Sequence, residues 1–236
     1  MNREVLNLKA AAEHVKVDAN ELKHVAQRGE IPASEHGGDW WFEHRDLDEW
    51  AQRNLLAVGH RELGERHTAM VLDLPKESRR AWRIAPLFRP DATDMEIHAK
   101  TKGGAIRDMA DLAIASGLVY DEEGFYKALV EREEAASTAI GHNAAFLHPK
   151  YHDPYFFEDT FVAYGRTRRP VFFGAPDGEG TRHFFLICCT DHEQHLRILA
   201  RLAVIAHGTD LMERLELAET PEDAIATIAA CENEIA

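Results

Sequence analysis

His148 is the residue best placed to carry out chemistry, because it ends an extended run of small residues, 137–149. A neutral imidazole is a good nucleophile near pH 7, since its pKa lies close to that pH. Phosphoryl transfer asks little more of a protein than an in-line nucleophile and a cation to neutralise the phosphoryl oxygens. Arg132, with its forked guanidinium, could bind those oxygens in bidentate fashion. The pair is therefore a candidate site for accepting a phosphoryl group.

A second histidine, His195, lies where an anion is favoured. The segment from Thr190 to His195 follows an apolar run, Phe184–Cys189, and is predicted to begin a helix with Thr190 and Glu193 as a capping box. The N-terminus of a helix presents unpaired N–H groups and the positive end of the helix dipole. We therefore expect His195 to share the anion of the first site.

Other interpretations of these residues remain open. His148 could be an ordinary packed or surface histidine, His195 a solvated one, and Arg132 a partner of Glu131 or Glu134 on a helix surface. A metal site is disfavoured, because no H-x-x-x-H or H-x-H spacing on one element supports it. That alternative would use a cluster of five histidines: His142, His148, His152, His192 and His195. We predict no metal and no cofactor.

The elements that must position these side chains follow from hydrophobic periodicity. Helices are predicted at 105–116, from Asp121 onward, at 191–206 and at 221–235, and Phe184–Cys189 has the continuous apolar character of a central strand buried on both faces. Other strands are expected at Met95–Lys100, Ala139–Leu147, Thr160–Tyr164 and Pro170–Phe173. The alternation predicts an α/β fold, a three-layer αβα sandwich with a mixed sheet, over residues 87–236.

The first 55 residues have a different pattern, of short helices and a hairpin. Asp18 is predicted to cap a helix that stops at Gly29, and 36–39 forms a turn before a strand at Trp40–Phe42. A last helix carries Leu47 and Trp50. Residues 56–86 are predicted to be a linker with some helix, such as Glu77–Ile84.

Composition excludes several classes of protein. The formal net charge of −14 disfavours non-specific binding to nucleic acid or to anionic membranes. No apolar run approaches the roughly 18 residues of a membrane span, and no signal-peptide pattern is present. The adjacent Cys188 and Cys189 lie in an apolar run and are expected to be reduced core residues. A cytoplasmic location without membrane insertion is the expectation.

Residues from about 87 to 236 resemble the mannitol/fructose-type enzyme IIA domains of the bacterial phosphoenolpyruvate-dependent phosphotransferase system, including their nitrogen-regulatory branch. That family carries Arg-Glu, a short gap and then T-G-I-G-N-G-I-A-I-P-H, which here reads T-A-I-G-H-N-A-A-F-L-H over 138–148 without a gap. The resemblance implies that His148 is phosphorylated, that His195 is its partner histidine and that Arg132 helps to hold the phosphoryl group. Thr138 could add a hydroxyl hydrogen bond.

The loop departs from the family pattern at several positions, two of which are glycines in the family. Ala139 and Asn143 replace glycines, and His142, Ala144 and Leu147 stand where Asn, Ile and Pro are usual. Since glycine adopts positive φ at little cost, the loss of two glycines is expected to change the loop backbone. The altered loop would then either change the choice of partner or leave a domain that senses without being phosphorylated.

The N-terminal residues resemble the excisionase/MerR-like winged helix-turn-helix. The matching residues are Leu8–Ala12, Val17–Leu22, Gly29–Ala33, Gly37–Phe42 and Asp46–Trp50. Residues 1–55 hold seven Lys/Arg against eleven Asp/Glu, a net −4 that is unusual for a DNA-binding module. The presumed recognition helix offers only Lys23 and His24, with Arg28 just beyond it. DNA binding and protein contact both stay open.

These observations lead to one hypothesis and three alternatives. The chain is expected to accept a phosphoryl group on His148 from a histidine-containing phosphocarrier protein, to pass it to a IIB or regulatory protein, and to signal through its N-terminal module. The first two alternatives are a non-phosphorylated interaction module and a transcription factor with a IIA-like sensing or dimerisation domain. A metallohydrolase is the third and least favoured.

Overall fold

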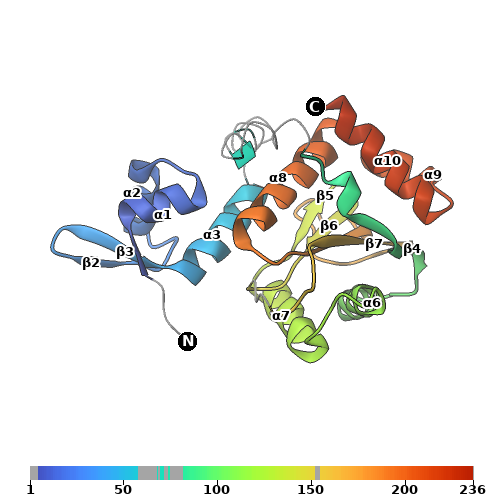
Figure 1. The fold of residues 1–236 in the computed structure, drawn as a ribbon, viewed down its shortest axis with the longest axis horizontal. Helices are drawn as coiled ribbons and strands as arrows, with labels where there is room; N and C mark the ends of the chain where they lie inside the picture. Colours follow the sequence, from blue (N-terminus) through green and yellow to red (C-terminus); the bar gives the residue numbers. More distant parts are fainter. Residues whose placement is uncertain are drawn as a thin grey trace.

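The computed structural model describes residues 5–57, 68, 70–71, 74, 82–151 and 155–235. Figure 1 shows a small N-terminal part beside a larger one in which helices cover both faces of a sheet. Most of the predicted helix at 77–84 lies outside the described residues. No helix in the described ranges is both long enough and apolar enough to cross a membrane.

A mixed five-stranded sheet forms the centre of the larger part, in the order β4-β7-β8-β6-β5. β7 pairs antiparallel with β8, whereas β4 runs parallel to β7 and β6 runs parallel to β8. As its apolar sequence predicts, β8 is central and buried. The strands are β4 (Phe88–Ile97), β5 (Ala139–Gly141), β6 (Ala144–Leu147), β7 (Phe161–Val171) and β8 (Thr181–Cys188).

Two predicted strand assignments are wrong. The strands expected at 160–164 and 170–173 are one long strand, β7, in which a register shift against β8 between Arg166 and Val171 accommodates the polar middle. The single extended segment expected over 139–147 is instead a hairpin, β5–β6, that turns at His142 and Asn143. The turn places Phe146 and Leu147 in a strand parallel to β8.

Helices on both faces of the sheet complete three layers, as predicted (Figure 1). Separate apolar clusters fill the two sides of the sheet. Thr220 and Asp223 form a reciprocal capping box at the start of the last helix, where Pro221 takes the first helical position. The helices are α6 (Lys102–Ala115) and α7 (Glu122–Ala135) on one face, and α8 (His192–Gly208), α9 (Leu211–Leu217) and α10 (Pro221–Glu234) on the other; a 3-10 turn, η1 (Ala85–Leu87), precedes β4.

The N-terminal part has helices and a hairpin as predicted, with one further strand, β1, that the sequence analysis did not predict. Asp18 accepts hydrogen bonds from the N–H groups of Asn20 and Glu21 at the start of α2, and Gly29 has the positive φ of a helix stop. Gly37 and Gly38 make the two-residue turn of the hairpin. The elements are β1 (Val5–Asn7), α1 (Leu8–Val15), α2 (Ala19–Gln27), β2 (Ser34–His36), β3 (Asp39–Glu43) and α3 (His44–Ala57).

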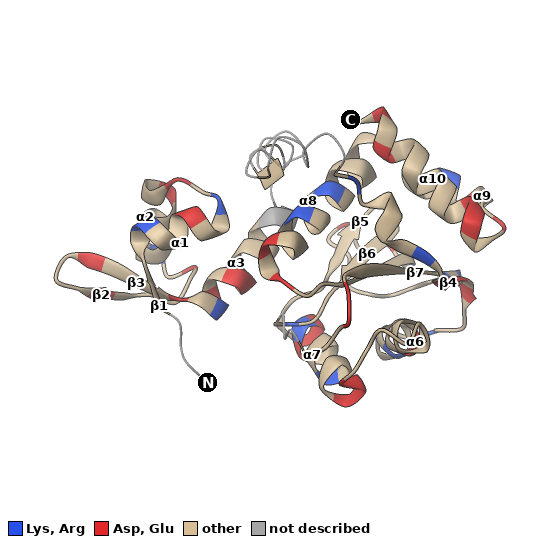
Figure 2. Ribbon diagram, viewed as in Figure 1, with Lys and Arg blue, Asp and Glu red and all other residues tan. Residues whose placement is uncertain are grey.

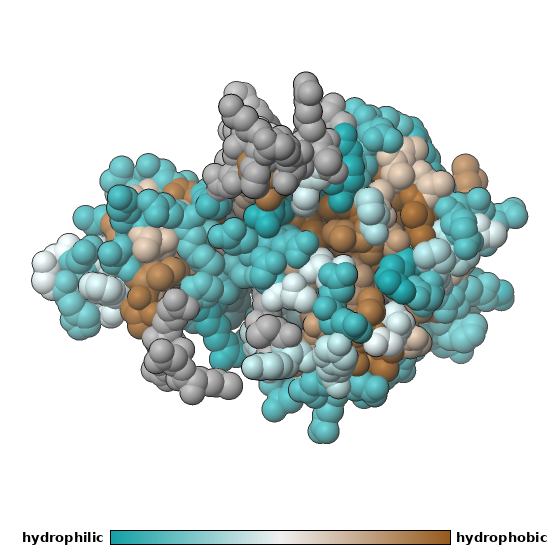
Figure 3. Space-filling view, viewed as in Figure 1, coloured by the Kyte–Doolittle hydropathy of each residue, from teal (hydrophilic) through white to brown (hydrophobic). Residues whose placement is uncertain are grey.

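The two parts of the chain are packed together through α3. This helix lies against α8, and one buried apolar cluster runs from the N-terminal helices into the α8–α10 layer. Leu47, Trp50 and Ala51 of α3 belong to that cluster, as do Leu196 and Leu199 of α8. This shared apolar cluster docks the N-terminal part on the sheet domain. On the face seen in Figure 3, by contrast, hydrophilic residues cover most of the N-terminal part.

Candidate phosphoryl-acceptor site

His148 follows directly after β6 and is buried, with 1% of its surface exposed. Its Nδ1 lies 2.8 Å from the carbonyl oxygen of Phe146. Because a carbonyl can only accept a hydrogen bond, this contact places the proton on Nδ1. The other ring nitrogen, Nε2, then holds the lone pair that a nucleophile needs.

Arg132, near the end of α7, points its guanidinium at that nitrogen. Its Nε donates to His148 Nε2 at 2.9 Å, and its Nη1 donates to the carbonyl of Ala136 at 2.8 Å. Burial lowers the pKa of Arg132, while the carboxylates of Glu133 and Glu49 act in the opposite direction. An arginine keeps its charge in this setting, so the site has a fixed cation next to the candidate nucleophile.

His195 lies in the first turns of α8 and packs beside His148. The ring centroids are 4.8 Å apart and the side chain of His195 is fully buried. The structure thus brings together His148, His195 and Arg132, which are far apart in the sequence. The predicted Thr190 cap is wrong, because Asp191 is the N-cap and its side chain accepts from Gln194 N–H. Glu193 cannot then complete a box with Thr190, since the helix begins one residue later.

Thr138 precedes β5 and is also buried, but its hydroxyl is bonded to another group. It donates to Glu133 Oε2 at 2.5 Å, and its backbone N–H donates to the same carboxylate. Lys102 pairs with Glu133 at 2.7 Å. Glu133 therefore holds the start of the β5–β6 hairpin to α7. The expected hydrogen bond from Thr138 to a phosphoryl oxygen stays a prediction.

Gln52 of α3 is a site residue that the sequence analysis did not identify. It is fully buried, and its Oε1 lies 3.1 Å from His148 Nε2. The two ends of an amide side chain can exchange by rotation, and within the described part of the chain Gln52 Nε2 has no hydrogen-bond partner. With the amide turned, Gln52 Nε2 would share the lone pair of His148 Nε2 with Arg132 Nε. No local motif signals this contact, since the two residues are 96 positions apart.

The loop between β5 and β6 keeps the backbone of a tight turn despite its lost glycines. Gly141, His142 and Asn143 all have positive φ, at 77°, 49° and 63°. Asp177 accepts a hydrogen bond from the backbone N–H of His142 at 3.2 Å. Non-glycine residues adopt this conformation at a cost, so the backbone is strained at His142 and Asn143. His152 of the predicted histidine cluster lies outside the described residues.

The candidate DNA-contacting residues lie on and just after α2. His24 and Arg28 are exposed and Lys23 is half-buried; Arg28 forms an ion pair with Glu30. Acidic residues are interspersed with basic ones over the N-terminal part (Figure 2). The candidate basic residues therefore lie among acidic ones in the described part of this domain.

Two protein-family models match the chain. The model described as "Phosphoenolpyruvate-dependent sugar phosphotransferase system, EIIA 2" matches residues 86–231, and a helix-turn-helix domain model matches residues 5–55. The fructose-specific EIIA component of Haloferax volcanii is 31% identical over 150 residues, which cover 61% of this chain and 94% of that protein. The fructose-specific EIIABC component of Bacillus subtilis is 28% identical over 148 residues. Those residues cover 62% of this chain but only 23% of the Bacillus protein.

Solved structures share the fold of the larger part. The complex of enzyme IIA mannitol and phosphorylated enzyme IIB mannitol from Escherichia coli aligns with a TM-score of 0.53 at 20% sequence identity, covering 60% of this chain and 96% of that one. The match to the family model extends over most of the chain and includes every residue of the candidate site except Gln52. The chain therefore belongs to the EIIA 2 family of the phosphoenolpyruvate-dependent sugar phosphotransferase system, as a phosphocarrier or regulatory domain joined to a helix-turn-helix domain.

Proposed function

We propose that His148 is the phosphoryl acceptor of this domain and that it reacts through Nε2. The observation that carries the proposal is the geometry of the ring: Nδ1 is held by the Phe146 carbonyl, and Arg132 points at Nε2 from 2.9 Å. An incoming phosphoryl group would take the place of the Arg132–His148 hydrogen bond. The guanidinium would then bind the phosphoryl oxygens, as charge-assisted pairs of this kind do.

His195 would be a positioning residue for the same group. Its ring packs beside His148 at the start of α8, where the helix dipole favours negative charge. In the transfer, His148 Nε2 forms a bond to phosphorus while the bond from phosphorus to the donor's nitrogen breaks. The donor nitrogen recovers its lone pair, and no proton has to leave His148 before the attack because Nε2 is unprotonated.

The partners follow from this chemistry. The donor is a histidine-containing phosphocarrier protein, and the receiver is a IIB-type or regulatory protein. The matched Escherichia coli structure is a complex of a IIA domain with a phosphorylated IIB domain, which supports the second partner. The three cysteines are free and buried, which suits the reducing cytoplasm, where we place the chain.

The N-terminal helix-turn-helix domain would read the phosphorylation state, because α3 occupies the approach to His148. Gln52 lies against the nitrogen that must be phosphorylated, and His148 is almost fully buried beneath it. A phosphoryl group on Nε2 therefore requires α3 to move. Phosphorylation would release the N-terminal domain from the sheet domain, and the released domain would bind DNA or protein differently.

The test is phosphoryl transfer on the full chain. Purified protein would be mixed with phosphoenolpyruvate, enzyme I and the small histidine phosphocarrier, and its intact mass recorded. We expect an acid-labile gain of one phosphoryl group that is lost in His148→Ala and kept in His207→Ala. A His148→Ala protein that is still phosphorylated would contradict the assignment of the acceptor.

A second function is a IIA-like sensor that is never phosphorylated, acting within a DNA-binding regulator. The burial of both His148 and His195 favours it. In this case the mass would not change although the donor is shown to be charged. Binding of the N-terminal domain to DNA would then be insensitive to the donor.

A further inference from the structure

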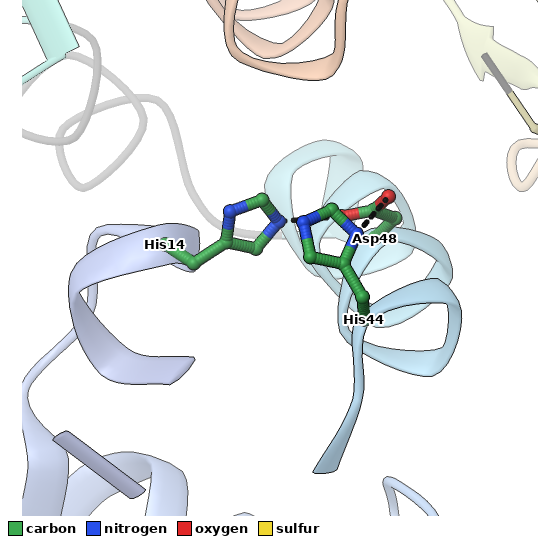
Figure 4. Close-up of side chains that lie close together, drawn as sticks. All are labelled: His14, His44 and Asp48. Carbon is green, nitrogen blue, oxygen red and sulfur yellow. Dashed lines mark hydrogen bonds and ion pairs between the residues drawn. The ribbon is translucent and has the colours of Figure 1, made fainter. Parts of the chain in front are cut away.

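Four side chains from three helices meet at the junction of the two domains. His14 comes from α1, His44 and Asp48 from α3, and His192 from the start of α8. Both His14 Nε2 and His192 Nε2 lie next to Asp48 Oδ1, at 2.6 Å and 2.9 Å, and His44 Nδ1 lies 3.3 Å from Asp48 Oδ2. Figure 4 shows His14 and His44 pointing at the Asp48 carboxylate from two different helices.

We propose that this cluster binds a divalent transition-metal ion such as Zn²⁺, with His14, His44, Asp48 and His192 as its ligands. Three imidazoles and one carboxylate are the donor set that Zn²⁺ takes in proteins. His44 and Asp48 are four residues apart on one helix and so point to the same side. The sequence does not predict this site, because its other two ligands come from α1 and α8.

The present geometry is close to that of a coordination sphere. Bonds of about 2.0–2.1 Å in a tetrahedral site place neighbouring ligand atoms about 3.3 Å apart. One ligand atom each from His14, His44 and Asp48 lies within 4.8 Å of the others. These three atoms are grouped more widely than a coordination sphere requires, so the rings would have to rotate towards one another to bind an ion, and His192 would join them through the Nε2 that already lies 2.9 Å from Asp48 Oδ1. The His14 and His192 rings, now stacked with centroids 4.9 Å apart, would turn their Nε2 atoms towards it.

The charge of the cluster also fits a cation. Asp48 supplies a carboxylate whose two oxygens both lie next to imidazole nitrogens. Three imidazoles around one carboxylate repel one another when they are protonated, whereas one divalent ion can replace their protons. The side chains are 8–34% exposed, which leaves the ion a route in.

The site would fasten the helix-turn-helix domain to the sheet domain. Asp48 and Gln52 lie one turn apart on α3, and His192 and His195 lie one turn apart on α8. Asp48 meets His192 in one layer, and Gln52 meets His148, which packs beside His195, in the next. An ion held by α1, α3 and α8 would therefore fix the arrangement in which α3 covers His148.

The experiment uses the full chain, free of affinity tags and stripped with a chelator, and titrates it with Co²⁺, a spectroscopic substitute for Zn²⁺. We expect one Co²⁺ per chain, with the visible absorption of a four-coordinate site. The variants Asp48→Asn and His44→Gln should weaken binding by more than about tenfold, because even outer-sphere partners of metal ligands contribute about 10–100-fold. His36→Gln, a change at an exposed histidine of the hairpin, is the matched control.

The outcomes separate a built site from adventitious binding. Loss of binding in the two ligand variants, with circular dichroism unchanged and the control normal, would support the site. His44→Gln guards against misfolding, since its side chain is 34% exposed. The proposal would be overturned if the wild type bound no Co²⁺ at about 100 μM. It would also be overturned if the wild type, the two ligand variants and the control all bound Co²⁺ with equal affinity. Saturating Zn²⁺ should also raise the Tm of the wild type by about 5–10 °C and leave that of Asp48→Asn unchanged.

Discussion

Replacement of Gln52 by alanine should speed the phosphorylation of His148. Gln52 is the α3 side chain whose amide lies 3.1 Å from the reacting nitrogen, and it is fully buried. A neutral hydrogen bond of this kind contributes about 0.5–1.5 kcal/mol. Removing it weakens the closed arrangement of α3 by that amount, which increases the open population about 2- to 10-fold.

The assay is the initial rate of phosphoryl uptake from the phosphorylated carrier protein, followed by intact mass. If α3 must move before transfer, the rate follows the open population and rises by the same factor. Gln27→Ala makes the same chemical change on the exposed surface of α2 and should leave the rate unchanged. A folded Gln52→Ala protein that reacts at the wild-type rate would refute the idea that α3 gates the site.

The opposite change at the same position gives the opposite sign. Gln52→Glu would place a carboxylate beside the Arg132 guanidinium, which lies at the same nitrogen of His148. Charge-assisted hydrogen bonds are about twice as strong as neutral ones, so the closed arrangement would gain stability. The carboxylate would also repel the incoming phosphoryl group. The rate of phosphoryl uptake should therefore fall. A simple loss of packing would change the rate in the same direction in both variants, whereas the gate predicts a rise for Gln52→Ala and a fall for Gln52→Glu.

Three further outcomes are expected. Zn²⁺ at a hundredfold excess over its Kd should stabilise the closed state by about 2.7 kcal/mol and slow phosphoryl uptake by up to about 100-fold, but not in Asp48→Asn. His142→Gly should raise the free energy of unfolding by about 0.5–1 kcal/mol in denaturant titrations, because His142 has a φ of 49°. Burial lowers the pKa of His183 to about 4, below the 6.5 of the unfolded chain. The unfolded state then binds more protons, so unfolding at pH 4 should be easier than at pH 7 by on the order of 2–3 kcal/mol, and His183→Gln should reduce this difference.

Much of the sheet domain could be predicted from the sequence, because its signals are local. The apolar run at Phe184–Cys189 predicted a buried central strand, and the helices predicted from Asp121 onward and at 221–235 do begin at the capping side chains of Asp121 and Thr220. The hairpin at His142 and Asn143 was missed because neither residue is a glycine, and the turn is held in part by Asp177, which is distant in sequence. The helix α9 was also not predicted; it has seven residues and no side-chain cap.

The contacts across the domain junction could not be predicted in this way. Gln52, His14 and His44 lie in the N-terminal domain. Across the junction, Gln52 meets His148, just after β6, and the two histidines meet His192 on α8. No periodicity or motif links segments so far apart in the chain. Only the docking of α3 on α8 brings them together, and that docking depends on apolar residues that would suit many partners.

The pairing of Asp48 with His192 and of Gln52 with His148 makes α3 a shared component of two sites. If α3 moves as a rigid body to free His148 Nε2 for a phosphoryl group, it also carries Asp48 and His44 away from His192. Phosphorylation and metal binding would then be antagonistic by thermodynamic linkage, each lowering the affinity of the other by the same factor. A measured Co²⁺ affinity that falls on phosphorylation of His148 would therefore report the movement of the helix-turn-helix domain directly, without any knowledge of its DNA or protein target.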